Sequence, residues 1–154
     1  MPYARNDPVD LYYETLGTAR DPALLMINGL GSQAISWPAD FCRKFVEAGF
    51  FVIRFDNRDV GLSTKFGQFR PDVMAVARAV ANGEEPVVAY RLSDMAADAV
   101  AVLDELGIGR AHVLGVSVGG MIAQRLAIDH PGRLLSLTSA MSLIADHAGI
   151  TVET

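Results

Sequence analysis

The sequence of 154 residues lacks several features that mark special environments. It has a single cysteine, Cys42, so no disulfide can form within it and a disulfide-based secreted scaffold is excluded. The first residues have neither the basic start nor the apolar run of a signal peptide. No stretch of about eighteen apolar residues is present that would cross a membrane. These absences predict a cytoplasmic protein that does not associate with membranes.

Positive charge and metal ligands are also scarce. The 13 basic and 18 acidic residues give a net charge of −5, and no basic cluster is present. Because nucleic-acid binding requires a concentrated basic surface, no nucleic-acid partner is expected. The three histidines are scattered without a second ligand at metal spacing, so we expect no metal and no cofactor. Hydrophobic residues make up 51% of the chain, which predicts a packed core.

The sequence does contain short apolar runs that alternate with helical patterns. This alternation predicts the α/β class, with a mostly parallel sheet flanked by helices. Proline and glycine interrupt residues 63–90, where we expect a loop excursion with one short helix. The predicted strands cover residues 9–16, 24–28, 50–55, 111–116 and 134–141. The predicted helices cover 37–48, 72–81, 94–106 with Ser93 as N-cap, and 119–129.

The most informative motif is Gly115-Val116-Ser117-Val118-Gly119, between a predicted strand and a predicted helix. A G-x-S-x-G sequence at such a junction is typical of a nucleophile elbow, a sharp turn that projects the serine hydroxyl away from the sheet. The flanking positions must be small because strand and helix cross closely there. The alternative is a plain glycine-rich turn, one that cradles a phosphate for example, although the lysine of a P-loop is missing.

A second glycine-rich turn, Asn28-Gly29-Leu30-Gly31, follows the first buried strand. Such a turn lets a backbone N–H point into a site without an intervening side chain. The N–H groups of Leu30 and Val118 would then be the two donors that stabilise an oxyanion in an acyl-transfer reaction. The alternative interpretation is an ordinary glycine turn after a strand.

With these motifs the chain resembles the α/β-hydrolase superfamily, and within it the carboxylesterase-like and methylesterase-like hydrolases. The resemblance extends over residues 28–32, 55–63, 94–108 and 111–131. It implies a small-molecule ester substrate and an acyl-enzyme on Ser117, with Leu30 and Val118 as oxyanion donors. Many relatives have His at the position of Asn28 and Met at that of Val118.

Other residues near these motifs are weaker candidates. Gly29 and Trp37 are candidates for substrate binding, with core packing at the start of a helix as the alternative for Trp37. In the family that the chain resembles, Arg58 and Asp59 look like loop residues that fix the fold beside the site. Cys42, with no second thiol or histidine nearby, is expected to be a core residue.

The general base of such an enzyme is a histidine that a carboxylate orients, and both follow the serine along the chain. His130 lies at the far end of its predicted helix, on the order of 15 Å from Ser117. His112 is at the opposite end of the sheet, and His130 is expected to be a capping or surface residue. Asp129 is the first acidic residue after Ser117. Asp146 with His147 is a weak alternative pair, and Glu153 is the last acidic residue.

The resemblance implies that the acid and the histidine follow two further strands. We therefore expect residues 1–154 to be the N-terminal part of a single α/β-hydrolase domain, truncated after the sixth strand and without a cap. The strand over 134–141 would then be an open edge through which the chain self-associates.

Three functions stay open at this stage. The first is a serine esterase, incomplete in this chain. The second is a non-catalytic binding or assembly module on the same fold. The third is a different reaction of the same serine, as in a lactonase, a peptidase or an acyltransferase.

Overall fold

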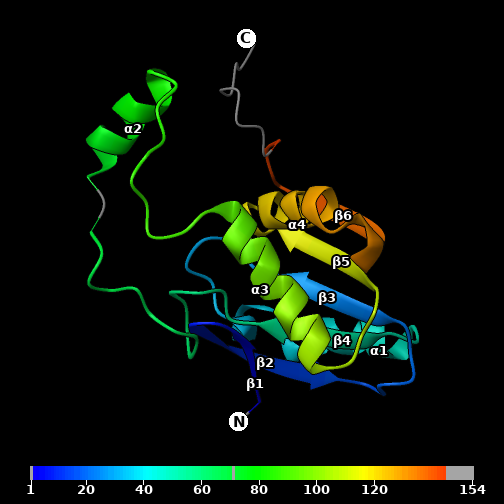
Figure 1. Cartoon of the computed structure of the whole chain (residues 1–154). Coiled ribbons are helices and arrows are strands. Elements are labelled where there is room, and N and C mark those ends of the chain that lie inside the picture. Colours follow the sequence, from blue (N-terminus) through cyan, green and yellow to red (C-terminus); the bar gives the residue numbers. More distant parts are fainter. Residues whose placement is uncertain (1, 71, 145–154) are drawn as a thin grey trace.

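A computed structural model describes residues 2–70 and 72–144. Its centre is a six-stranded sheet in the order β1-β2-β4-β3-β5-β6 (Figure 1). The strands are β1 (Tyr3–Asn6), β2 (Val9–Leu16), β3 (Ala23–Ile27), β4 (Phe51–Phe55), β5 (Ala111–Val116) and β6 (Leu134–Ala140). The helices are α1 (Ala39–Glu47), α2 (Val73–Ala81), α3 (Leu92–Glu105) and α4 (Val118–Asp129), with 3-10 turns η1 (Ala34–Ser36) and η2 (Pro131–Arg133).

The sheet is mixed. Strands β3, β4, β5 and β6 are parallel to one another. At one edge, β2 pairs antiparallel with β4, and β1 pairs antiparallel with β2. All five residues of β3 are buried, as expected for a central parallel strand covered on both faces. The α/β class and the mostly parallel sheet flanked by helices are therefore confirmed. The carboxyl ends of β3, β4 and β5 meet at one end of the sheet, where the polar loops begin.

The core is divided between the two faces of the sheet. Helices α3 and α4 cover one face, where their side chains pack on alternate residues of β3 and β4 such as Leu25 and Ile53. On the other face, Trp37 and Cys42 pack on Leu24 and on other residues of β3 and β4. Alternation along each strand thus fills both layers, because successive side chains point to opposite faces.

Several element boundaries differ from the sequence prediction. The short strand β1 was not predicted. Helix α3 begins at Leu92, so the N-cap is Arg91 and the prediction of Ser93 is wrong. The reason is a bond across the first turn, in which the carboxylate of Asp94 accepts the Arg91 backbone N–H at 2.7 Å. Helix α1 begins only at Ala39, because proline keeps the preceding Trp37 extended.

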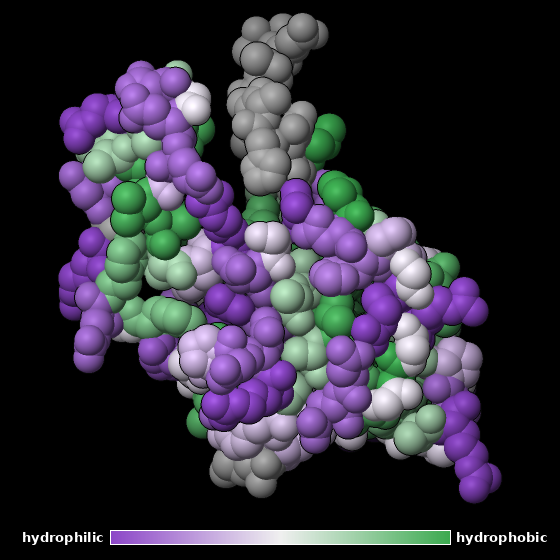
Figure 2. All heavy atoms as spheres, viewed as in Figure 1, coloured by the Kyte–Doolittle hydropathy of each residue, from purple (hydrophilic) through white to green (hydrophobic). Residues whose placement is uncertain are grey.

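The excursion between β4 and α3 carries α2, which confirms the single short helix expected there. Asp72 caps α2 by accepting the N–H groups of Met74 and Ala75. In Figure 1 the helix stands away from the sheet, and Figure 2 shows apolar atoms gathered on the same excursion. The exposed apolar side chains there include Val73, Met74, Val80 and Val87.

Strand β6 is the outermost strand in the described part of the chain, beyond β5. Its Leu135 and Leu137 are 45% and 38% exposed. Self-association through this edge stays a prediction, which sedimentation would test. Among the described residues, no helix has both the length and the apolar character needed to cross a bilayer.

Candidate functional site

Ser117 occupies the turn between β5 and α4 in a backbone conformation that residues other than glycine rarely adopt. Its φ is 56° and its ψ is −124°, whereas non-glycine residues with positive φ are uncommon. The Ser117 N–H donates to the Ala140 carbonyl at 2.9 Å, and the Ser117 carbonyl accepts the Gly120 N–H at 2.9 Å. These bonds hold the strained turn and leave Ser117 exposed at the start of α4. This is the geometry of the strand–turn–helix that defines a nucleophile elbow.

Close backbone packing explains the glycines on either side of Ser117. A Cβ atom on Gly115 would lie 2.2 Å from the Gly119 carbonyl oxygen. A Cβ atom on Gly119 would lie 2.2 Å from the Ile27 carbonyl oxygen, in the adjacent strand β3. No side chain fits at such distances. The two glycines let α4 cross β5 and β3 closely enough to seat Ser117 at the carboxyl end of the sheet.

The turn after β3 lies directly beside Ser117. A Cβ atom built on Gly29 would be 3.3 Å from the Ser117 Cβ and 3.8 Å from its Oγ. The Leu30 N–H has no acceptor among residues 2–70 and 72–144. The Val118 N–H belongs to the first residue of α4, where helical backbone donors lack an internal acceptor. The fold therefore brings together Gly29, Leu30, Ser117 and Val118, from two segments distant in sequence.

Buried polar side chains fix the turn that contains Leu30. The Asn57 amide donates to the Asn28 carbonyl at 3.1 Å, and the Asn28 amide donates to the Gln33 carbonyl at 2.9 Å. The Asp56 carboxylate accepts the Ala34 N–H at 2.6 Å. Sequence reasoning did not single out Asp56 or Asn57. Their position directly after a buried parallel strand was a usable signal, since the carboxyl ends of neighbouring strands meet.

A cavity of about 180 Å³ is lined by both glycine-rich turns and adjoins Ser117 through its neighbour Val118, although Ser117 itself is not a lining residue. Leu30 and Val118 line it from the two turns, Met95 lines it from α3, and Tyr90 lines it from the residues before α3. Trp37 is not among its lining residues. It lies instead under α1, 9% exposed and stacked on Phe41 at 5.9 Å between ring centroids. The structure thus places Gly29 at the cavity and Trp37 in the core.

Arg58, which also lines this cavity, forms a buried ion pair. Its Nε and Nη2 atoms donate to the two Asp98 carboxylate oxygens at 2.6 and 2.7 Å. The two side chains are 7% and 2% exposed, and Asn6 donates to the same carboxylate at 2.8 Å. Burial opposes the charge of Arg58, but the bond to Asp98 and its negative charge raise the pKa of the guanidinium. Arg58 therefore ties the loop after β4 to α3, which is the loop-fixing role expected for it.

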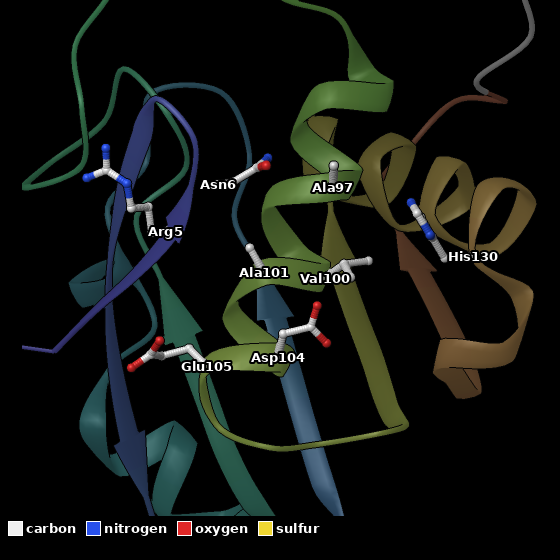
Figure 3. A pocket seen from close by; sticks show the side chains of 8 residues that line it. All are labelled: Arg5, Asn6, Ala97, Val100, Ala101, Asp104, Glu105 and His130. Atoms are coloured by element: carbon white, nitrogen blue, oxygen red, sulfur yellow. The ribbon is translucent and has the colours of Figure 1, made fainter.

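Neither described histidine lies at Ser117. The Nδ1 atom of His112 is 2.7 Å from the Ser136 hydroxyl, at the amino end of β5. His130 follows α4 and lines a separate cavity together with Arg5, Asp104 and Glu105, as Figure 3 shows. Asp129 is paired with Arg125 at 2.6 Å. The alternative residues Asp146, His147 and Glu153 lie outside the described residues.

The family of this chain follows from comparison with known proteins. The chain belongs to the alpha/beta hydrolase fold family, whose model matches residues 22–153. The resemblance expected from the sequence is thereby confirmed.

Individual relatives within that family are hydrolases. The chain is 41% identical over 133 residues to rhodomycin D methylesterase of Streptomyces peucetius, covering 86% of this chain and 39% of that protein. It is 33% identical to 3-oxoadipate enol-lactonase 2 of Acinetobacter baylyi, over 81% of this chain and 39% of that protein. The crystal structure of a hydrolase from Pseudomonas aeruginosa superposes with a TM-score of 0.66 at 29% identity, over 86% of this chain and 42% of that one. The chain thus spans about 40% of the length of these relatives.

Proposed function

We propose that this chain carries the nucleophile and the oxyanion donors of a serine hydrolase that cleaves carboxylic esters. The observation that carries the proposal is the backbone of Ser117, held at a φ of 56° between β5 and α4 with its side chain exposed. Maintaining a strained residue requires compensating contacts, and such strain is concentrated at functional sites. Similarity to a methylesterase supports an ester as the substrate class.

In the proposed reaction, the Ser117 Oγ attacks the ester carbonyl carbon and transfers its proton to a general base. The carbonyl oxygen becomes an oxyanion, which accepts hydrogen bonds from the Leu30 and Val118 N–H groups. The carbon–oxygen bond to the alcohol then breaks, and the alcohol leaves with the proton from the base. Water hydrolyses the acyl-Ser117 ester, which releases the acid and restores the serine.

The general base is not one of the histidines that the structure describes. The His112 ring contacts the Ser136 hydroxyl at the amino end of β5. His130 lies after α4 and lines the separate cavity beside α3. A serine with no base retains only the part of catalysis that binding and the oxyanion donors supply. We therefore place the nucleophile and the oxyanion donors, but no general base, within residues 2–70 and 72–144.

A lactone is the second candidate substrate, since it is a cyclic ester and the same serine chemistry opens it. Similarity to 3-oxoadipate enol-lactonase 2 favours this candidate. Parallel assays with methyl esters and with lactones on one preparation separate the two substrate classes.

The test of the proposed nucleophile is the substitution Ser117→Ala in the full-length gene product. We expect it to abolish labelling by a fluorophosphonate probe and to lower ester turnover by about 10⁶-fold, the loss typical of a missing serine nucleophile. The matched control is Ser36→Ala, which removes an exposed hydroxyl in η1. Unchanged turnover in Ser117→Ala refutes the proposal. A folded full-length protein with no turnover of any ester or lactone favours a non-catalytic binding module instead.

A further inference from the structure

The cavity beside Ser117 is smaller than the sites that hold whole drug-sized ligands. Its volume is about 180 Å³, against roughly 300–1,000 Å³ for such sites. Apolar side chains of Val60, Met95 and Val118 contribute to its walls. Leu30 and Val118, whose N–H groups are the proposed oxyanion donors, are part of the same lining. Because both proposed donors line it, this cavity adjoins the proposed position of the reacting carbonyl.

Two side chains, those of Arg58 and Phe66, pack against the Tyr90 ring, although Tyr90 lies in a loop. The Arg58 guanidinium carbon lies 5.2 Å from the centroid of the Tyr90 ring, within the range of a cation–π contact. The Phe66 ring packs at 5.5 Å from Tyr90 between centroids. Because Asp98 holds Arg58 by two hydrogen bonds, the support of Tyr90 is itself fixed to α3.

The surroundings of Tyr90 also affect its ionisation. Burial, together with the nearby Asp59 carboxylate, raises the pKa of Tyr90 to about 12. The phenol therefore stays neutral at physiological pH, and the ring presents an uncharged surface to the cavity. The Arg58 guanidinium lies over the face of the Tyr90 ring and Phe66 packs against the same ring, which leaves it little freedom to move aside for a larger ligand.

We propose that this cavity binds a short apolar group of the ester substrate and that Tyr90 determines how long that group can be. The inference rests on the proposed esterase function and adds to it a specificity-determining residue. The apolar group belongs either to the acid or to the alcohol of the ester, and the chemistry of recognition is the same. Two ester series, one lengthened on each side of the carbonyl, identify which part occupies the cavity.

The experiment measures chain-length preference in the full-length gene product. In Tyr90→Ala, we expect kcat/KM for an octanoyl or octyl ester to rise about ten-fold or more relative to the acetyl or methyl ester. Met95→Phe places a larger side chain at another lining position and should change the same ratio in the opposite direction. Tyr3→Ala removes a tyrosine in β1 that does not line the cavity, so its ratio should equal that of wild type. An unchanged ratio in both Tyr90→Ala and Met95→Phe overturns the inference.

A binding measurement separates failure of this inference from failure of the proposed reaction. In the Ser117→Ala background, ligand-observed NMR compares the dissociation constants of two pairs of uncleaved analogues. Butanamide and octanamide differ on the acid side, and N-butylacetamide and N-octylacetamide differ on the alcohol side. If Tyr90→Ala improves the relative affinity for octanamide or for N-octylacetamide, the cavity binds apolar chains whether or not Ser117 forms an acyl-enzyme. If neither Tyr90→Ala nor Met95→Phe changes the relative affinities, the cavity is not the subsite, even where Ser117 proves to be the nucleophile. Should Tyr90→Ala fail to fold, Met95→Phe provides both measurements.

Discussion

The turn that carries Ser117 and the turn that carries Leu30 lie side by side, yet different forces hold them. The Ser117 turn is fixed by close contact between backbones. Gly115 packs against the Gly119 carbonyl, and Gly119 packs against the carbonyl of Ile27, at distances that leave no space for a methyl group. Close backbone packing, together with the backbone hydrogen bonds of Ser117, therefore determines where Ser117 lies.

The Leu30 turn is fixed by buried hydrogen bonds. Asn57 and Asp56 reach from the end of β4 to the backbone of Asn28 and Ala34, and both side chains are 3% exposed. A Cβ atom added to Gly31, which follows Leu30, would meet no atom within 4 Å apart from the adjoining residues of the chain. This turn thus has space around it at Gly31, and polar contacts hold it in position.

The difference between the two turns has a consequence for substitutions. Backbones that pack in direct contact cannot accommodate an added methyl group, so the substitution displaces a strand or a helix. Hydrogen bonds can be removed one at a time, and each typically costs about 1–3 kcal/mol when a buried partner is left unpaired. We therefore expect changes in the first turn to act on folding and changes in the second to act mainly on catalysis.

The largest effect is expected from Gly119→Ala. The new methyl carbon would lie 2.2 Å from the Ile27 carbonyl oxygen and 2.6 Å from that of Asn28, and neither backbone group can rotate away. We expect a loss of more than about 4 kcal/mol in the free energy of unfolding, or no folded protein at all. Urea unfolding followed by circular dichroism measures it. Gly109→Ala, at a position with open space around it, is the control. A loss below about 1 kcal/mol would show that β3 and α4 separate easily, contrary to the steric account.

The contrast also explains which site residues the sequence could reveal. Ser117 and its glycines form a contiguous motif whose spacing encodes the turn, so the pattern is visible without a structure. Asn57 and Tyr90 come from other segments and reach the site only because β4 lies next to β3 and because α3 packs on the sheet. The residues around Tyr90 in the sequence do not predict its contact with Arg58, which comes from a distant segment.

Much of the fold was predictable for the same reason. Continuous apolar runs and helical periodicity predicted five of the strands and the four α-helices, because burial on both faces or on one stripe imposes those patterns. The strand β1 has only four residues with a single buried side chain, Ala4, so its pattern is too short to recognise. The start of α3 depends on the hydrogen bond that the Arg91 backbone N–H donates to the Asp94 carboxylate. This bond makes Arg91 the N-cap in place of Ser93.

The second effect is expected from Asn57→Ala. Loss of the amide leaves the buried Asn28 carbonyl without that donor, which should cost about 1–3 kcal/mol of stability. If the Leu30 N–H is an oxyanion donor, its displacement should also lower kcat by about 10²-fold with little change in KM, since the donor acts in the transition state. Steady-state kinetics on the full-length gene product measures both constants.

A matched control for Asn57→Ala is Asn82→Ala, which alters an exposed asparagine at the end of α2. An increase in KM at constant kcat in Asn57→Ala would contradict the account, because it would assign Asn57 to substrate binding rather than to the position of the oxyanion turn. A loss of stability without any kinetic change would equally contradict it.

The smallest effect on folding is expected from Gly31→Ala, although Gly31 lies only two residues from Gly29. Its φ is 68°, so alanine meets backbone strain of about 1–2 kcal/mol but no steric clash. Gly49→Ala, with a φ of 86° and equally open surroundings at the end of α1, imposes comparable strain far from Ser117. Equal losses of stability in the two variants, with reduced kcat only in Gly31→Ala, would show that the strained Leu30 turn shifts. Its shift would displace the Leu30 N–H from the oxyanion. Equal kcat in both would mean that hydrogen bonds from Asn57 and Asp56 hold the turn in place against that strain.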